Sequence, residues 1–459
     1  MGRMTSRLTR WFNKGKRAMS PMQITALVFA GLILLGACLL MLPVSTRSGE
    51  GCDFLSALFT ATSATCITGL SLFDTWSQWS GFGQVVILCL IQIGGLGFMS
   101  MASVGVFLLR KKVGLKQRLV MAQALSLNNM DGVVKVQKTV LLGSFTLEAI
   151  GALVLTLRFL PEFGFWQASK WGIFHAISAF CNAGFDIFGS MTPGVSLMEF
   201  QSDPFVLITL SLLIIIGGLG FLVWEEVARI KRFKKFSAYT KLVLLTTLVL
   251  LLGGTLGICA LEWNNPGTLG SMHWTDKLLN GFFQSVSMRT AGFFSVDQGL
   301  LTDGGKGLSI LLMFVGGSSG STAGGAKTVT VVVLLLFLWN RARGRSHISV
   351  FKRSIPDKQV LDAMTIVSIM VAMVIFGGIF ITATSPVSLT DGLYESVSAL
   401  CTVGVTAGAT TSLSLAAKLL IIVYMYFGRV GILTISLGFL MGNQAEERFR
   451  YAKTNLLIG

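Results

Sequence analysis

Charged residues are scarce in this chain. Asp, Glu, Lys and Arg make up 13% of its 459 residues, whereas hydrophobic residues make up 53%. A soluble domain carries about 25% charged residues. The composition therefore excludes an ordinary soluble protein and predicts a chain that lies in a membrane.

Residues that bind metals or carry out acid–base chemistry are also few. The seven cysteines form no CxxC pair and no zinc spacing, which predicts neither a disulfide framework nor a metal site. The three histidines, His175, His273 and His347, are far apart in the sequence, and no nucleophile–base arrangement can be placed. We therefore expect no enzymatic activity. No GxGxxG motif occurs, so the sequence predicts no Rossmann-type nucleotide-binding unit in this chain.

Positive charge is the exception to this scarcity, with a net charge of +16. Lys and Arg cluster in residues 3–17, 110–118, 229–235, 341–358 and 448–453, and each cluster adjoins a long apolar run. This pattern is typical of the cytoplasmic loops of membrane proteins and not of a nucleic-acid-binding face. The first apolar run is too long for a signal peptide, so we expect it to remain as a membrane helix.

Eight apolar stretches are long enough to span a membrane. They lie near 23–43, 82–109, 138–160, 204–228, 240–262, 307–340, 360–383 and 417–440. The basic clusters place both termini and the loops near 110–137, 229–239 and 341–359 in the cytoplasm. The four other connections then face outward and carry most of the acidic residues, as ordinary outer loops do or as a cation-attracting pore entrance would.

Each outer connection contains a short helix-like stretch that ends in a similar octapeptide. The four octapeptides are TSATCITG (62–69), ISAFCNAG (177–184), SVSMRTAG (285–292) and VSALCTVG (397–404). Their last glycines are separated by 115, 108 and 112 residues. Chance similarity among Ser-, Ala- and Gly-rich segments is the alternative to a true repeat, but four occurrences between pairs of spanning helices favour the repeat.

We therefore expect an all-α polytopic membrane protein made of four covalently linked helix–pore loop–helix (M1-P-M2) repeats around one pore, with pseudo-fourfold symmetry. The predicted segments are a basic cytoplasmic tail at 1–20, repeats at 21–110, 135–232, 238–342 and 356–443, and a C-terminal cytoplasmic tail at 444–459. Irregular backbone is tolerated at membrane depth where it is surrounded by protein or lines a water-filled cavity. Backbone carbonyls in four such loops could replace the hydration shell of a cation.

The second helix of each repeat carries a glycine cluster. Close helix packing would explain the clusters at 93–98 and 216–221. The tract at 315–328, VGGSSGSTAGGAKT, is a poor helix former, so we expect it to break the sixth span into two halves below the filter. It resembles a phosphate-binding loop, but Ala326 stands where that motif requires glycine, and we reject this interpretation.

Three basic residues stand inside these apolar repeats. Arg429 occupies the position of Gly95, Gly218 and Gly317 in the other copies, and could be a positive plug below the filter or a structural anchor. Arg289 replaces the cysteine of the other octapeptides. We expect it to form a buried ion pair behind the pore wall, with Glu148 as a conceivable partner. Lys327 could steady the tract or extend to the inner membrane surface.

Together, these features resemble the Ktr/Trk/HKT superfamily of potassium transporters, most closely its KtrB-type membrane subunits, over about residues 20–450. The resemblance implies potassium uptake across the bacterial cytoplasmic membrane, with K⁺ bound by filter backbone carbonyls and Na⁺ as a possible activator. The implied filter residues are Thr68, Gly69, Ala183, Gly184, Ala291, Gly292, Thr402, Val403 and Gly404. The implied gate residues are Gly316, Gly317, Ser318, Ser319, Gly320, Gly324, Gly325, Lys327 and Arg429.

The same resemblance implies a homodimer on a cytoplasmic ring of Rossmann-type, KtrA-like regulatory subunits, which would bind the nucleotide. A sodium-coupled secondary transporter of another cation or small solute is the alternative. Such transporters use midplane ionisable residues and repeats of opposite topology. Here the four repeats share one orientation and ionisable residues within the spans are few, which disfavours the alternative.

Overall fold

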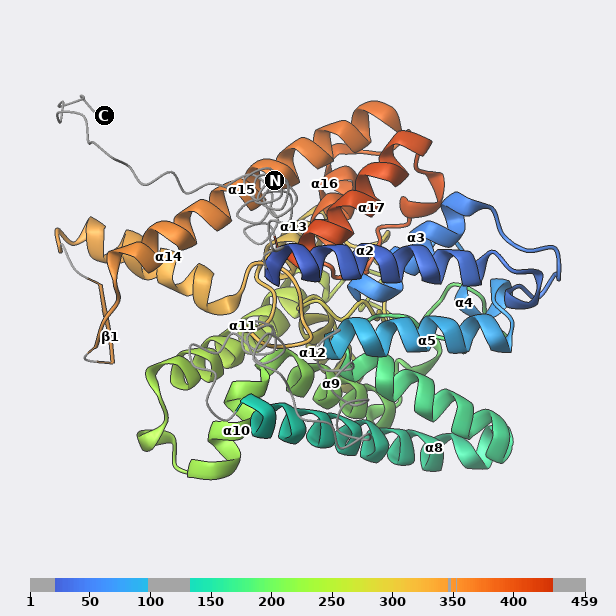
Figure 1. Ribbon diagram of the computed structural model, residues 1–459, viewed down its shortest axis with the longest axis horizontal. Coiled ribbons are helices and arrows are strands. Elements are labelled where there is room, and N and C mark those ends of the chain that lie inside the picture. Colours follow the sequence, from blue (N-terminus) through green and yellow to red (C-terminus); the bar gives the residue numbers. More distant parts are fainter. Residues whose placement is uncertain (1–20, 98–132, 346–347, 352, 432–459) are drawn as a thin grey trace, which may run out of the picture.

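The computed structural model describes residues 21–97, 133–345, 348–351 and 353–431 (Figure 1). Repeat 1 contains α2 (Pro21–Leu40), α3 (Phe54–Cys66), α4 (Thr75–Gln78) and α5 (Gly81–Leu96). Repeat 2 contains α8 (Val133–Phe180), α9 (Pro204–Leu219) and α10 (Phe221–Ile230). Repeat 3 contains α11 (Ala238–Glu262), α12 (Trp274–Ser287), α13 (Asp303–Phe314) and α14 (Thr328–Ala342). Repeat 4 contains α15 (Asp357–Thr384), α16 (Leu389–Leu400) and α17 (Leu415–Val430).

The remaining elements are short. The 3-10 turns are Pro43–Ser45, Phe188–Ser190, Met198–Phe200, Phe233–Lys235 and Thr410–Ser412. Strands β1 (Ser349–Val350) and β2 (Arg353–Ser354) form an antiparallel pair in the connection between α14 and α15. The short helices α3, α12 and α16 and the end of α8 are the pore helices expected between the spanning helices.

Many apolar side chains on the outside of the molecule face away from the protein. Leu142 and Leu153 on α8, Leu256 on α11 and Leu361 on α15 are all at least 60% exposed. Four of the described helices are long and apolar enough to cross a membrane, and α9 with α10 would make a fifth as a bent pair. The protein is therefore an all-α, multi-pass membrane protein, which confirms the expected fold class.

The repeats pack in a closed cycle. The second helix of each repeat contacts the pore helix of the next: α5 packs on α8, α9 on α12, α13 on α16, and α17 on α3. Each second helix begins at a polar N-cap residue. Its side chain accepts a hydrogen bond from one of the backbone N–H groups that have no partner within the helix. These caps are Ser80, Asp203, Thr302 and Ser414.

The structure shows where three of the expected spans end or break. The span near 138–160 ends at Gly164, whose φ of 73° and ψ of 168° are not helical, so the label α8 covers two helices: this span and the second pore helix. The span near 204–228 is two helices, α9 and α10, bent by 97° at Gly220, whose φ of 92° is unfavourable for other residues. The span near 307–340 is broken between α13 and α14, as the glycine-rich tract predicted. The ends of the spans near 82–109 and 417–440 lie outside the described residues.

The glycine clusters of the second helices pack against the pore helices. A Cβ on Gly94, Gly217 or Gly428 would collide with the carbonyl oxygen of Thr65, Phe180 or Leu400, respectively. Each of these carbonyls belongs to the residue four positions before the glycine that ends the octapeptide. The helix-packing interpretation of the first two clusters is therefore confirmed.

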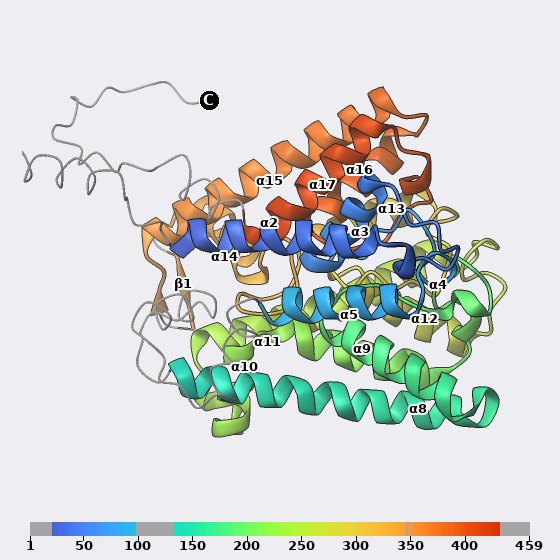
Figure 2. The same cartoon turned by 45° about the vertical axis from the view of Figure 1, so that its right-hand side comes forward.

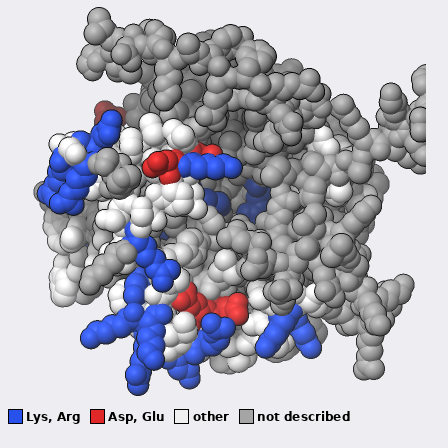
Figure 3. All heavy atoms as spheres, turned by 60° about the vertical axis from the view of Figure 1, so that its left-hand side comes forward, with Lys and Arg blue, Asp and Glu red and all other residues white. Residues whose placement is uncertain are grey.

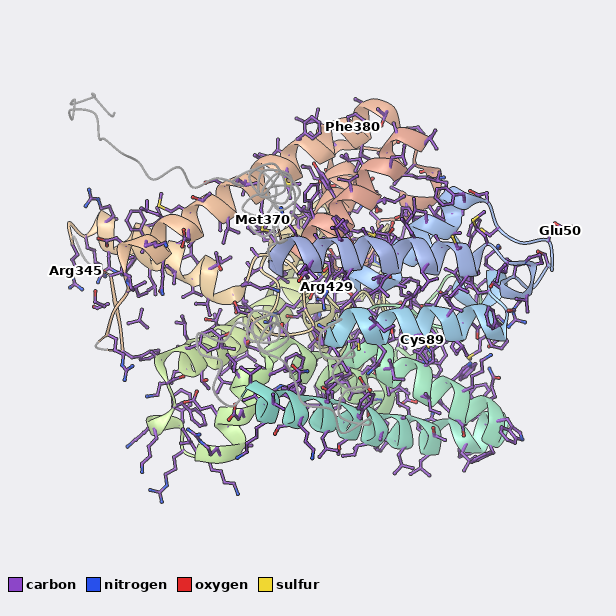
Figure 4. All side chains as sticks on the ribbon, in the orientation of Figure 1. Glu50, Cys89, Arg345, Met370, Phe380 and Arg429 are labelled. Atoms are coloured by element: carbon purple, nitrogen blue, oxygen red, sulfur yellow. The ribbon has the colours of Figure 1, made fainter. Side chains whose placement is uncertain are left out.

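The two ends of the molecule differ in charge. Figure 3 shows Lys and Arg gathered at the end where α10, α14 and the β1–β2 pair lie. Exposed basic side chains of the described residues at this end include Arg229, Lys231, Arg232, Lys234, Lys235, Arg341, Arg343, Arg345 and Arg353. Figure 4 shows Arg345 at this end and the acidic Glu50 at the opposite end.

Replacing Gly217 by Ala should destabilise the protein, because the added methyl group has no space against the Phe180 carbonyl. Overpacking of this kind costs about 1–3 kcal/mol. We expect Gly217→Ala to lower the thermal unfolding midpoint of the detergent-purified protein, measured by tryptophan fluorescence. The control is Gly253→Ala in α11, where a Cβ would meet no atom within 4 Å. Equal midpoints for the two variants would contradict the packing argument.

Candidate ion pathway

The four octapeptides end in the same backbone conformation. The residue two positions before the last glycine is left-handed in every copy: φ is 58° at Ile67, 58° at Asn182, 67° at Thr290 and 50° at Thr402. The last glycines also have positive φ, from 71° to 98°. Because non-glycine residues seldom adopt such a φ, its presence in all four copies indicates that the loops are built for one shared purpose.

These loops meet one another at their glycines. A Cβ on each glycine would lie less than 3 Å from the carbonyl oxygen of the residue before the next repeat's glycine. The facing pairs are Gly69 and Ala183, Gly184 and Ala291, Gly292 and Val403, and Gly404 and Thr68. The pairs follow the order of the repeats and return to the first, so the expected filter residues form a closed ring. Only glycine allows four backbones to approach this closely.

Buried serines in the pore helices support the loops. Ser63 and Ser398 accept hydrogen bonds from the backbone N–H groups of Gly69 and Gly404, each at 3.1 Å. In the other two repeats, Ser178 and Ser287 donate to the carbonyl oxygens of Phe185 and Phe293.

The sequence analysis did not assign these serines, although the sequence carries a signal for them. In the octapeptides of repeats 1, 2 and 4, a serine lies six residues before the last glycine. In that of repeat 3, a serine lies five residues before it.

The tract between α13 and α14 is an ordered, non-helical loop. Backbone bonds join its ends, with the Gly316 N–H donating to Ala326 and the Thr328 N–H donating to Gly317. Its middle is bound to repeat 2, because the Ser318 N–H donates to the Gly218 carbonyl and the Phe221 N–H donates to the Gly320 carbonyl. The Tyr239 hydroxyl of α11 also donates to the Ser319 carbonyl at 3.0 Å.

The second half of the tract lies against the ring. A Cβ on Gly324 would collide with the Thr402 hydroxyl, and one on Gly325 would lie 3.0 Å from the Gly316 backbone. The Lys327 ammonium donates to the Ala323 carbonyl at 2.7 Å. Lys327 could have steadied the tract or extended to the membrane surface, and this bond within the tract corresponds to the first role.

Arg429 joins three repeats at the centre of the molecule (Figure 4). From the last turn of α17, its guanidinium donates to the Thr322 carbonyl of the tract at 2.7 Å. It also donates to the carbonyls of Gly94 and Gly95 on α5. The positive charge of Arg429 is thus held beside the tract by backbone carbonyls. Among the described residues, no side chain accepts a hydrogen bond from it.

The structure contradicts the suggested ion pair between Arg289 and Glu148. Glu148 accepts two hydrogen bonds of 3.0 Å from the Gln92 amide. Arg289 is 7% exposed, forms no ion pair with any described residue, and borders a small cavity with Gly218 and Gly317. The two residues face different partners because Glu148 lies between repeats 1 and 2, whereas Arg289 lies between repeats 2 and 3.

A carboxyl group follows the ring closely in the chain. Asp186 is two residues beyond Gly184, in the loop between α8 and α9, and it accepts a hydrogen bond from the Phe188 N–H. Burial, and secondarily the charge of Asp74, raises the pKa of Asp186 to about 7. This carboxyl group therefore changes its charge near neutral pH.

The oxygen atoms of the ring suit an alkali cation. In the described part of the chain, no three His, Cys, Asp or Glu side chains are grouped as a metal site requires. The polar atoms that the four loops bring to the ring are backbone carbonyls, a group that can replace the water around a large monovalent cation. The pore helices also end at the ring, and a helix C-terminus carries partial negative charge.

Comparison with known proteins gives a consistent result. The family model of TrkH, described as a cation transport protein, matches residues 7–449. The chain is 42% identical to the Ktr system potassium uptake protein B of Bacillus subtilis, over 94% of this chain and 95% of the relative. It is 39% identical to the potassium/sodium uptake protein NtpJ of Enterococcus hirae, over 97% of this chain and 98% of the relative.

Among solved structures, the potassium transporter TrkH from Vibrio parahaemolyticus has the same fold. The TM-score is 0.71, with 18% sequence identity, and the match covers 92% of this chain and 86% of that one.

Proposed function

Because this chain belongs to the TrkH family of cation transport proteins, we propose that it takes up potassium through a pore at the centre of its four repeats. The observation that carries this proposal is the closed ring, in which each repeat's glycine faces a carbonyl of the next repeat. The two relatives named above are potassium uptake proteins, which supports K⁺ as the substrate.

In this proposal, the selectivity filter is formed by Thr68 and Gly69, Ala183 and Gly184, Ala291 and Gly292, and Thr402, Val403 and Gly404. One glycine per repeat gives fewer fixed carbonyl rings than the TVGYG loops of potassium channels, so selection among large alkali cations should be looser. The tract from Gly316 to Lys327 is the gate, and Arg429 holds it. The contacts of Thr322 and Gly324 described above support this assignment.

The orientation and the partners are part of the same proposal. The basic end would face the cytoplasm of a bacterial cell, because Lys and Arg are enriched in cytoplasmic loops. We further propose a homodimer on a ring of KtrA-like, nucleotide-binding subunits, with Na⁺ as an activator. The name of the Ktr system protein supports a system of several components, and that of the potassium/sodium uptake protein supports a link to sodium.

A substitution at the ring tests the filter. Gly404→Ser should reduce the preference for potassium over sodium by about tenfold, because a side chain cannot fit against the Thr68 carbonyl without moving it. The measurement is rubidium uptake, with sodium as competitor, in a bacterium that lacks its own potassium uptake systems and expresses the cognate regulatory subunit.

The matched control for this test is Gly307→Ser in α13, where a Cβ would meet no atom within 4 Å. The control should keep both uptake and preference. If the native chain carries no rubidium, or if Gly404→Ser keeps the native preference, the four-glycine filter is wrong and secondary transport has to be reconsidered.

The Asp186 carboxyl group predicts a dependence on external pH. Its raised pKa of about 7 means that the group is neutral at pH 6 and negative at pH 8. We propose that Asp186 lies near the pore entrance, where a negative charge concentrates cations. The KM for rubidium uptake should therefore rise about two- to fivefold between pH 8 and pH 6. Asp186→Asn, which is neutral throughout, should show the higher KM at both values. A native KM that does not change with pH would contradict this role.

A further inference from the structure

The tract uses a side-chain hydrogen bond to hold the pore loop of repeat 2. The Thr322 hydroxyl lies 3.2 Å from both the Asn182 amide oxygen and the Phe180 carbonyl oxygen. Thr322 and Asn182 are each 1% exposed. The Thr322 N–H also donates to the Gly217 carbonyl, so both the backbone and the side chain of Thr322 are bound to repeat 2.

Two residues further along, the tract contacts repeat 4. Gly324 lies against the Thr402 side chain, and a Cβ on it would be 2.8 Å from the Cys401 carbonyl oxygen. Repeats 2 and 4 are not neighbours in the ring, because each glycine faces the next repeat in chain order. Two residues span at most about 7 Å. The segment from Thr322 to Gly324 therefore crosses directly beneath the ring.

Asn182 is suited to hold this crossing. It occupies the left-handed position where the other copies have Ile67, Thr290 and Thr402, and it is the one amide among the four. Asparagine tolerates the left-handed conformation better than most residues. An isoleucine offers no polar atom to the tract, and a threonine side chain is shorter.

We propose that the hydrogen bond between Thr322 and Asn182 is a latch that holds the tract closed beneath the ring. Both are positioning residues, and the proposal rests on the proposed function of the chain as a gated potassium pore. The latch ties the gate of repeat 3 to the filter loop of repeat 2. A signal that opens the gate has to break this bond, and the Asn182 side chain is then released directly below Gly184.

The test is rubidium uptake into liposomes of phosphatidylethanolamine and phosphatidylglycerol that contain the full chain without a regulatory subunit. Thr322→Val keeps the shape of the side chain but removes the donor, and it should raise this unstimulated uptake about fivefold. Thr322→Ser keeps the hydroxyl and should behave like the native chain. The matched control is Thr365→Val on α15, where the lost bond is to the Leu361 carbonyl of the same helix.

The partner residue gives an independent second test. Asn182→Thr introduces the residue that repeats 3 and 4 carry at this position, so the left-handed loop can form. It should raise unstimulated uptake as Thr322→Val does, and the double variant should add little to either single variant, since all three lack the same bond. Potassium-over-sodium preference should stay native for Thr322→Val, whereas a damaged filter would lower it.

The outcomes separate the latch from the proposed function. No rubidium uptake by the native chain, with or without its regulatory subunit, would refute the pore itself. An active native chain overturns the latch if Thr322→Val shows native unstimulated uptake, if Thr322→Ser is as leaky as Thr322→Val, or if the two single effects simply multiply. If Thr322→Val fails to fold, native unstimulated uptake by Asn182→Thr overturns it.

Discussion

The close approach of four backbone loops is the constraint on which the rest of this structure depends. At the ring, each glycine lies so near the carbonyl of the next repeat that a single Cβ would collide with it. Four loops reach this distance only if their pore helices end at the same depth. The cyclic packing of second helices on pore helices sets that depth. The glycines that let each second helix contact the end of its own repeat's pore helix, at Thr65, Phe180 and Leu400, add close contacts within the repeats to this cycle.

Much of this arrangement could be predicted from the sequence because it repeats. Four octapeptides at nearly equal spacing indicated the loops, and the run of Gly, Ser and Thr between α13 and α14 indicated the broken sixth span. The bend at Gly220 was not predicted. Its sequence, IGGLGF, is identical to that of 93–98, and apolar composition alone does not say where a helix turns.

Contacts between repeats were the least predictable part. The sequence suggested Glu148 for Arg289, but Gln92 binds Glu148, because the faces that helices turn toward each other follow from packing and not from charge. The contact of Thr322 with repeat 2 was not predicted, for a related reason. In a tract rich in small polar residues, nothing in the sequence marks the one hydroxyl that reaches another repeat. The bonds from the pore-helix serines could not be predicted, because they depend on the backbone conformation of the loops. Only the glycines of the octapeptides hint at that conformation in the sequence.

A pore built from one chain can give each repeat a different task, and the differences among the four copies follow that division. Repeat 3 supplies the tract, repeat 4 supplies Arg429, which binds it, and repeat 2 supplies Asn182, which receives it. Repeat 1 supplies the Gly94 and Gly95 carbonyls on the other side of Arg429. In a homotetramer, four identical tracts would compete for the same space beneath the ring. The asparagine of NAG, which binds the tract, therefore follows the asymmetry that a single tract imposes on a fourfold ring.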